Sequence, residues 1–254
     1  MVVLDPEGEP GARAHSPLRD SMPDALPLVS FVVLALDEAD TLPGLLADLA
    51  AFPLAHDVVV ADGGSRDGTG ARAAALGARV VQAPRGRGTQ LGAGASAARA
   101  PVLCFLHADV RLDGAALSAL ARAASRRELA TLRLRIDAAG VRFRLIERAT
   151  NLRARAGLPY GDQGLLIPRE LYDAVGGYTA VPIMEDVAFV RALRRLGVRP
   201  TLLSAAVSVS PRRWLGEGVL RRTLRNWSLL AAYWAGVPPE RLARRYPQHP
   251  PARG

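Results

Sequence analysis

The sequence predicts an α/β protein with a mostly parallel central sheet flanked by helices. Short apolar runs of strand length alternate with segments of helical periodicity over most of the chain, and several runs stop abruptly at polar residues. Such alternation is typical of βαβ units, whose parallel strands are buried on both faces. Polar residues at the ends of the runs indicate a ligand site at the carboxyl edge of the sheet.

The first half of the chain gives the clearest alternation. Strands are predicted at 29–35, 57–61, 79–82 and 102–106. Helices are predicted after them at 41–51, 68–76, 89–98 and 114–124. Because a helix follows each strand and returns the chain to the next one, we expect a parallel, Rossmann-like sheet.

Beyond residue 130 the pattern is less regular. Strands are predicted at 131–136 and 164–168, and helices at 141–156 and 186–196. A last helix is predicted over 218–236, with one apolar stripe formed by Leu220, Leu224, Trp227, Ala231 and Trp234. We favour packing of this stripe into the core. The alternative is an interfacial helix that sets Trp at a headgroup layer and Arg against anionic lipid.

The composition fits one globular domain. At 254 residues and 49% hydrophobic content the chain can bury a large core, and we expect a single domain over 28–236. Residues 1–27 mix Pro, Gly and charges without period, which predicts a disordered extension, and 237–254 are expected to form a tail. No apolar run reaches the roughly 18 residues of a membrane span. The single Cys104 excludes disulfides within the chain, and we expect a cytoplasmic protein.

The charge indicates acidic partners. The formal net charge is +9, and all 33 basic residues are Arg. They are scattered, with short clusters, rather than gathered on one element, which disfavours nucleic-acid binding. Nucleotide diphosphates or anionic lipid headgroups fit this charge better.

One strand end carries the most informative pair of residues. The apolar run 102–106 stops at His107 and Asp109, two positions apart. Alternation along the chain points both side chains toward the same side. A carboxylate there can hold a divalent cation, and a cation can hold a diphosphate. A structural His is the alternative.

Further loops place polar residues at strand ends or helix starts. Glu38 follows the first strand, and Asp62 opens a Gly-rich turn in which it can accept a hydrogen bond from a nucleobase or a ribose. Arg87 and Gln90 stand at a helix start, an arrangement that favours phosphate. The alternatives are an ordinary turn with a helix cap and a basic loop that is merely exposed.

Two later segments add acids to an apolar context. Asp162 and Gln163 interrupt one such stretch, and Glu185 with Asp186 opens a predicted helix. A carboxylate there can act as a general base or serve only as a helix cap. Arg213 and Trp214 follow later in the chain. The Arg213 guanidinium is suited to a diphosphate, and the Trp214 indole is suited to a sugar or an apolar acceptor.

These motifs, taken in order, resemble the family 2 glycosyltransferases of GT-A fold over residues 28–234. The resemblance is strongest to the subgroup associated with radical-SAM and selenium or arsenosugar gene neighbourhoods. In that subgroup Asp-Gly-Gly-Ser, Gly-Arg-Gly-x-Gln, Phe-Leu-His-Ala-Asp, Pro-Tyr-Gly-Asp-Gln and Met-Glu-Asp-Val recur in this order. An ordered set is more specific than any one motif.

The resemblance implies an inverting, metal-dependent glycosyltransferase. It implies Asp186 as the catalytic base with Glu185 beside it, and Asp109 with His107 as the cation site. The expected nucleotide-sugar contacts are Glu38, Asp62, Arg87, Gln90, Asp162, Gln163, Arg213 and Trp214. The domain then divides into a donor-binding half (28–112), an acceptor half (113–216) and a C-terminal amphipathic helix (217–236).

Three residues depart from the family pattern. Gly63 stands where a second Asp is common, His107 replaces the first Asp of the DxD motif, and Ser210 replaces the Gln of Gln-x-x-Arg-Trp. The expected cofactor is a divalent cation, Mn²⁺ or Mg²⁺. Because imidazole suits Mn²⁺ better, the change at His107 favours Mn²⁺.

The expected partners are a UDP-, GDP- or dTDP-sugar donor and a small-molecule or lipid acceptor, with no nucleic acid. Peripheral contact with the inner face of a membrane is an option. One alternative is a sugar-phosphate nucleotidyltransferase, which needs a basic Gly-rich loop where Asp37 and Glu38 stand here. The other is a catalytically silent module that binds a sugar nucleotide or a nucleic acid. The acids Glu185 and Asp186 disfavour a catalytically silent module.

Overall fold

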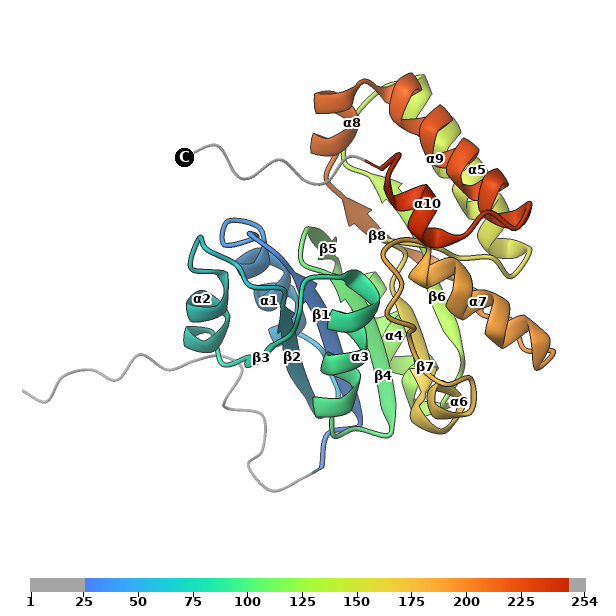
Figure 1. Cartoon of the computed structure of the whole chain (residues 1–254). Coiled ribbons are helices and arrows are strands. Elements are labelled where there is room, and N and C mark those ends of the chain that lie inside the picture. The colour runs from blue at the N-terminus through green and yellow to red at the C-terminus, as the bar shows by residue number, and fades with distance from the viewer. Residues whose placement is uncertain (1–25, 247–254) are drawn as a thin grey trace, which may run out of the picture.

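An eight-stranded sheet runs through the described residues in the order β3-β2-β1-β4-β7-β6-β8-β5 (Figure 1). The structure, a computed structural model, describes residues 26–246 except for the side chain of Arg213. The strands are β1 (Val29–Ala35), β2 (His56–Asp62), β3 (Arg79–Gln82), β4 (Val102–His107), β5 (Val110–Leu112), β6 (Ala130–Ile136), β7 (Leu165–Pro168) and β8 (Thr201–Val209). The helices are α1 (Leu42–Ala50), α2 (Thr69–Ala75), α3 (Arg87–Ala97), α4 (Gly114–Ser125), α5 (Val141–Arg155), α6 (Arg169–Ala174), α7 (Glu185–Arg195), α8 (Arg212–Glu217), α9 (Val219–Trp234) and α10 (Pro239–Ala243).

Most strands run in one direction, as predicted. β2 and β4 pair in parallel with β1, β3 with β2, and β8 with β6. β7 lies antiparallel between β4 and β6, and β5 is antiparallel to β8. Six of the eight strands therefore share a direction, which confirms the mostly parallel α/β sheet.

Helices cover both faces of the sheet, and β1 shows how. Its odd-numbered residues pack into a cluster with leucines of α1 and α4. Its residues Val32 and Leu34 face the other way, into a cluster with side chains of α3, α6 and α7. Because both faces are buried, alternation places an apolar residue at nearly every position of the strand.

Every predicted strand and helix is present, with ends shifted by at most two residues. The structure adds β5, α6, β8, α8 and α10, which the sequence did not predict. Of the predicted N-terminal extension, residues 1–25 lie outside the described residues, and so do residues 247–254 of the predicted tail. The helix α10 lies within that predicted tail.

The predicted core packing of the last helix is wrong. On α9 the apolar stripe is exposed, with 71% exposure at Leu220 and 64% at Trp227, and the buried residues are Arg222 and Leu229. The physical reason is that α9 packs through its opposite side, where Leu229 contacts Ile183 and α10 rather than the sheet. No helix among residues 26–246 is long and apolar enough to cross a membrane.

Candidate active site

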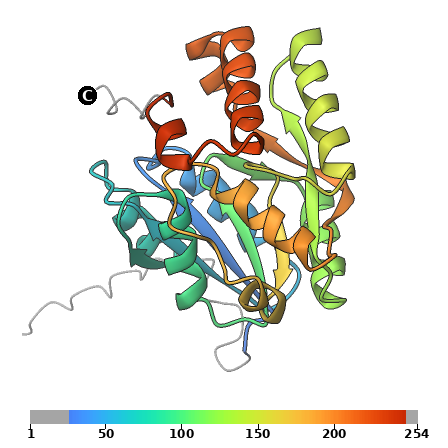
Figure 2. The ribbon, with the colours of Figure 1, turned by 45° about the vertical axis from the view of Figure 1, so that its right-hand side comes forward.

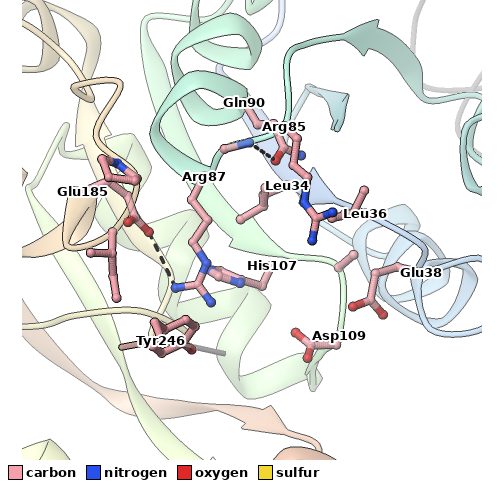
Figure 3. A pocket seen from close by; sticks show the side chains of 14 residues that line it. Leu34, Leu36, Glu38, Arg85, Arg87, Gln90, His107, Asp109, Glu185 and Tyr246 are labelled. Atoms are coloured by element: carbon pink, nitrogen blue, oxygen red, sulfur yellow. Dashed lines mark hydrogen bonds and ion pairs between the residues drawn. The ribbon is translucent and has the colours of Figure 1, made fainter. Parts of the chain in front are cut away.

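A cavity of about 350 Å³, drawn in Figure 3, lies at the carboxyl edge of the sheet. There β2 and β4 pair with β1 on its two opposite sides. This reversal of strand order is where parallel α/β sheets bind ligands. We call it the first cavity. Its polar lining consists of Glu38 after β1, Arg85, Arg87 and Gln90 around the start of α3, His107 and Asp109 at the end of β4, and Glu185 of α7.

A second cavity of about 320 Å³ lies between α5 and α9. Its polar lining includes Arg153, Tyr160 and Asp186, and its walls are largely apolar. The two cavities share three lining residues, which are Arg87, Ile183 and Tyr246. A ligand in one cavity would therefore lie next to a ligand in the other, with the Arg87 guanidinium between them.

Two carboxylates that are adjacent in the sequence line different cavities. Glu185 lines the first cavity and Asp186 lines the second. The preceding Met184 has a left-handed backbone (φ 67°), a conformation that non-glycine residues adopt at a cost and that is found at functional turns. No side chain caps α7, and Asp186 Oδ1 accepts a hydrogen bond from the N–H of Val187 at 2.7 Å.

Glu185 is a buried acid held against an arginine. Its side chain is 4% exposed, and its Oε1 lies 3.6 Å from Nη1 of Arg87. Burial and the neighbouring charge of Asp186 raise the pKa of Glu185 to about 7, although Arg87 lowers it. Burial lowers the pKa of Arg87, but the charges around it, above all that of Glu185, leave this pKa above its usual range.

This acid should make the stability of the protein depend on pH. Because its folded-state pKa is above the ordinary value of 4.5, the folded state holds a proton that the unfolded state has released between pH 4.5 and about 7. The free energy of unfolding should therefore fall as the pH rises through this window, by on the order of 1–3 kcal/mol. Glu185→Gln should flatten this slope in urea titrations at pH 5 to 8. An unchanged slope would contradict the assignment, and the exposed Glu240→Gln is the control.

A second cluster contains the predicted cation ligands and one more acid. Ligand atoms of His107, Asp109 and Asp162 lie within 4.8 Å of one another, and His107 Nδ1 is 3.3 Å from Asp162 Oδ1. Asp162 was predicted as a nucleotide-sugar contact, and the structure places it beside the two predicted cation ligands. The register explains this, because antiparallel β7 pairs Leu165 with Phe105 of β4 and so brings the residues before β7 alongside those that end β4.

One imidazole and two carboxylates suit a divalent cation. These donors can all be directed at one ion after small adjustments, since metal–ligand distances near 2.0–2.2 Å keep ligand atoms within about 4.4 Å of one another. A mixed nitrogen and oxygen donor set fits Mn²⁺ better than Mg²⁺.

Asp62 and Gln163 were predicted to contact the nucleotide sugar. In the structure both side chains form hydrogen bonds within the chain. Asp62 is 3% exposed and accepts hydrogen bonds from the N–H and hydroxyl of Ser65 and from the Gln82 amide. Gln163 is 1% exposed and donates to the carbonyl of Leu132 at 3.1 Å. Neither residue lines either cavity, so their observed contacts shape the loops around the site.

Gln90 lines the first cavity but also joins two strands. Its amide nitrogen donates to the carbonyls of Ala35 and Ala61, at the ends of β1 and β2. A Cβ at Gly63 would lie 2.9 Å from this amide. Gly63, which departs from the family pattern, therefore leaves room for the Gln90 amide. A side chain at position 63 would press against this amide.

Gly88 allows α3 to lie against the loop before α7. A Cβ there would overlap the carbonyl oxygen of Thr179 and lie 3.3 Å from Cβ of Glu185. Gly88→Ala should therefore lower the free energy of unfolding by about 1–3 kcal/mol through overpacking. The matched control is Gly92→Ala on the same helix, where a Cβ would meet nothing closer than 3.8 Å. It should raise stability by about 0.5–1 kcal/mol. Equal effects of both changes in urea denaturation would contradict this packing.

The remaining predicted residues are Glu38, Arg213 and Trp214. Glu38 is 8% exposed, and its Oε2 lies 3.5 Å from Nη2 of Arg212. Arg213 belongs to α8, and its side chain is outside the described part of the structure. Trp214 lines the second cavity, with the Arg222 guanidinium 5.4 Å from its ring centroid.

Arg85, Arg153 and Tyr246 are among the lining residues that were not predicted as site residues. Arg85 and Tyr246 line the first cavity, and Arg153 lines the second, where its guanidinium lies 4.2 Å from the centroid of Tyr160. Burial lowers the pKa of Arg153. Arg153 is one of several Arg on a basic helix, so no periodicity distinguishes it, whereas Arg85 could have been selected with the adjacent Gly-rich loop.

Comparison with known proteins gives one family and several similar folds. Residues 30–182 match the sequence profile of Glycosyl transferase family 2. An uncharacterized glycosyltransferase of Mycobacterium tuberculosis, Rv0539, is 38% identical over 93 residues, which are 36% of this chain and 41% of that protein. The match thus spans less than half of this relative.

Two solved structures show the same fold at low sequence identity. Mannosyltransferase PcManGT from Pyrobaculum calidifontis, in complex with GDP-Man and Mn²⁺, has a TM-score of 0.57 and 18% identity, with coverage of 90% of this chain and 67% of that one. Glucosyl-3-phosphoglycerate synthase from Mycobacterium tuberculosis, in complex with Mn²⁺, UDP and glucosyl-3-phosphoglycerate, has a TM-score of 0.53 and 20% identity. The match to the synthase covers 80% of this chain and 77% of that one.

Proposed function

The chain belongs to glycosyl transferase family 2, and on that premise we propose that it transfers a sugar from a nucleotide-diphosphate donor to an acceptor hydroxyl. The observation that carries the proposal is the meeting of two cavities at Arg87, with a cluster of cation ligands whose members line both. Such a site can hold two substrates side by side, as group transfer requires.

The first cavity is suited to the donor. Arg85 and Arg87 offer guanidinium groups to a diphosphate, and Glu38 can accept hydrogen bonds from a ribose or nucleobase. The mannosyltransferase of similar fold holds GDP-Man and the synthase holds UDP, which supports a UDP-, GDP- or dTDP-sugar here. Of the predicted nucleotide-sugar contacts, we propose Glu38, Arg87, Gln90 and Arg213 as direct ones, with Asp62 and Gln163 shaping the loops around them. Asp162 would act on the donor through the cation, and Trp214 lines the second cavity.

His107, Asp109 and Asp162 would hold the divalent cation, preferably Mn²⁺. When bound, the cation supplies positive charge that stabilises a departing diphosphate. Both similar structures named above contain Mn²⁺, which supports this choice.

Asp186 is the proposed base because it faces the second cavity. Its carboxylate takes the proton of the acceptor hydroxyl, the hydroxyl oxygen forms a bond to the anomeric carbon, and the bond from that carbon to the diphosphate oxygen breaks. We propose that the acceptor attacks from the second cavity, in line with the bond that breaks, and inverts the anomeric carbon, as the family resemblance implies. Arg87, between the cavities, stabilises the charge that grows on the leaving diphosphate.

The second cavity is suited to an acceptor with an apolar part. Leu134, Ile146, Trp214 and Leu230 line it, while Arg153 adds a positive charge near Asp186. A lipid or a small molecule with an anionic group fits this lining. The ordered motifs support membership of the subgroup found beside radical-SAM and arsenosugar genes. We propose residues 28–112 as the donor half, around the first cavity, and 113–216 as the acceptor half, around the second. Residues 217–236 would form a wall of the second cavity.

The first experiment is thermal unfolding with UDP-, GDP- and dTDP-sugars, each with Mn²⁺, Mg²⁺ or a chelator. One nucleotide should stabilise the protein only with a cation, by about 2–3 kcal/mol at a hundredfold excess over Kd. Asp109→Ala should abolish this shift, and the exposed Asp173→Ala on α6 should keep it. No shift with any sugar nucleotide would contradict a donor site. Binding without nucleoside diphosphate release in any acceptor screen would favour a silent module.

A further inference from the structure

Large exposed apolar side chains gather on one side of the molecule. Of ten such side chains in the described residues, eight lie on α5, α8 and α9. We call this surface the α5–α9 face, formed by Val141, Leu145, Leu152, Leu215, Leu220, Leu224, Trp227 and Trp234. Single exposed apolar residues are ordinary, but a gathered set marks an interaction surface.

The exposed residues form both rims of the second cavity. On α5, Leu145 and Leu152 flank Ala149, which lines the cavity. On α9, Leu220 and Trp227 flank Thr223, which lines it from the other side. The two helices stand side by side above the sheet (Figure 2), and residues of both line the second cavity.

The same helices are strongly basic. Together α5 and α9 carry eight Arg and one acid, Glu147. Glu147 is buried, and its Oε2 pairs with Arg144 at 2.8 Å, so it places no negative charge on the exposed side. The exposed Arg are Arg142, Arg148, Arg155 and Arg221.

We propose that the α5–α9 face binds the surface of a lipid bilayer that contains anionic headgroups, with the mouth of the second cavity toward the bilayer. Leu and Trp side chains enter the boundary between headgroups and acyl chains, and the flanking Arg pair with anionic headgroups. The strength of such binding grows with the buried apolar area and with attraction to anionic lipids, and this face offers both.

A second copy of the chain fits the face less well. In a symmetric dimer the same patch meets itself, so the exposed Arg of both copies would lie opposite one another. Glu217, the acid of α8, already pairs with Arg222 and Arg225 of its own chain. The charge complementarity therefore favours an anionic bilayer. Binding to lipid does not require sugar transfer, so its failure is distinguishable from failure of the proposed function.

The test is sedimentation of the full chain with vesicles of phosphatidylcholine alone or with 30% phosphatidylglycerol. We expect binding to the anionic vesicles at least tenfold tighter than to the neutral ones, with a blue shift of Trp emission. Leu220→Glu with Leu224→Glu should weaken binding at least tenfold, because both side chains are exposed on α9. Arg221→Gln should weaken it about fivefold. Leu196→Glu, at an exposed position outside the face, should bind as the unchanged protein does.

Several results would overturn the proposal. These are equal binding to both vesicle types, no binding to either, or an equal loss in Leu196→Glu. Sedimentation velocity without lipid that shows a dimer, separated by the two α9 changes, would assign the face to a second copy instead. Thermal unfolding of each variant verifies that it is folded, and the exposed positions make loss of folding unexpected.

Discussion

Replacing Asp186 by Asn is expected to lower the kcat of sugar transfer by about 10²–10⁴-fold, because the side chain can no longer take the proton of the acceptor hydroxyl. Asn has almost the same shape, so the second cavity and the start of α7 should be retained. Donor binding should be unchanged, since Asp186 does not line the first cavity. The measurement is release of nucleoside diphosphate at saturating donor and acceptor, with donor affinity measured separately by titration.

The neighbouring acid provides the matched control. Glu185→Gln changes a carboxylate of the first cavity, next in sequence, and should affect donor affinity and the pH dependence of stability more than kcat. If Asp186→Asn keeps most of its kcat while Glu185→Gln loses it, the base is Glu185. A pKa of about 7 would suit Glu185 for that role, so the comparison tests the assignment directly.

The sheet could be predicted from the sequence because its strands are buried on both faces. β1 and β4 are apolar at nearly every position, and the polar residues that end them are those that line the first cavity. Local signals of this kind need no knowledge of distant contacts. The parallel direction followed from the intervening helices, which return the chain to the same edge.

The two strands that were not predicted, β5 and β8, depend on pairing with residues distant in the sequence. β5 is only three residues long and is a strand because it pairs with β8. β8 is partly exposed along much of its length, so its sequence shows neither clear alternation nor a continuous buried run. Amphipathicity also predicted the helix α9. It could not show which side of α9 packs against the rest of the protein, because periodicity defines an apolar stripe but not the element that the stripe contacts.

The sequence selects a site residue by the chemistry that its side chain can perform. Asp186, Asp109 and His107 line the two cavities, and their roles stay predictions. Asp62 was expected at the nucleoside, but its carboxylate accepts hydrogen bonds from Ser65 and Gln82. An acid after a strand can serve a ligand or its own loop, and only the positions of the neighbouring donors distinguish the two.

Asp162 is the residue whose role changes most between sequence and structure, and Asp162→Asn is expected to raise the Mn²⁺ concentration for half-saturation by about 10²-fold. A neutral amide is a weaker ligand than a carboxylate, and it also removes the charge beside His107. Mn²⁺ binding can be measured on the protein alone by electron paramagnetic resonance of the free ion. Asp109→Asn should give a loss of similar size, and the exposed Asp173→Asn should give none.

The alternative role makes the opposite prediction. If Asp162 contacts only the nucleotide sugar, Asp162→Asn should leave Mn²⁺ affinity unchanged and raise the KM for the donor. The antiparallel register of β4 and β7 argues for the cation, because it brings Asp162 beside His107 without help from a donor contact. The cluster then has two carboxylates despite the His in the DxD position, the second being supplied by the loop before β7. His107→Asp should accordingly be tolerated and should shift the preference from Mn²⁺ toward Mg²⁺, since it makes every ligand of the cluster an oxygen.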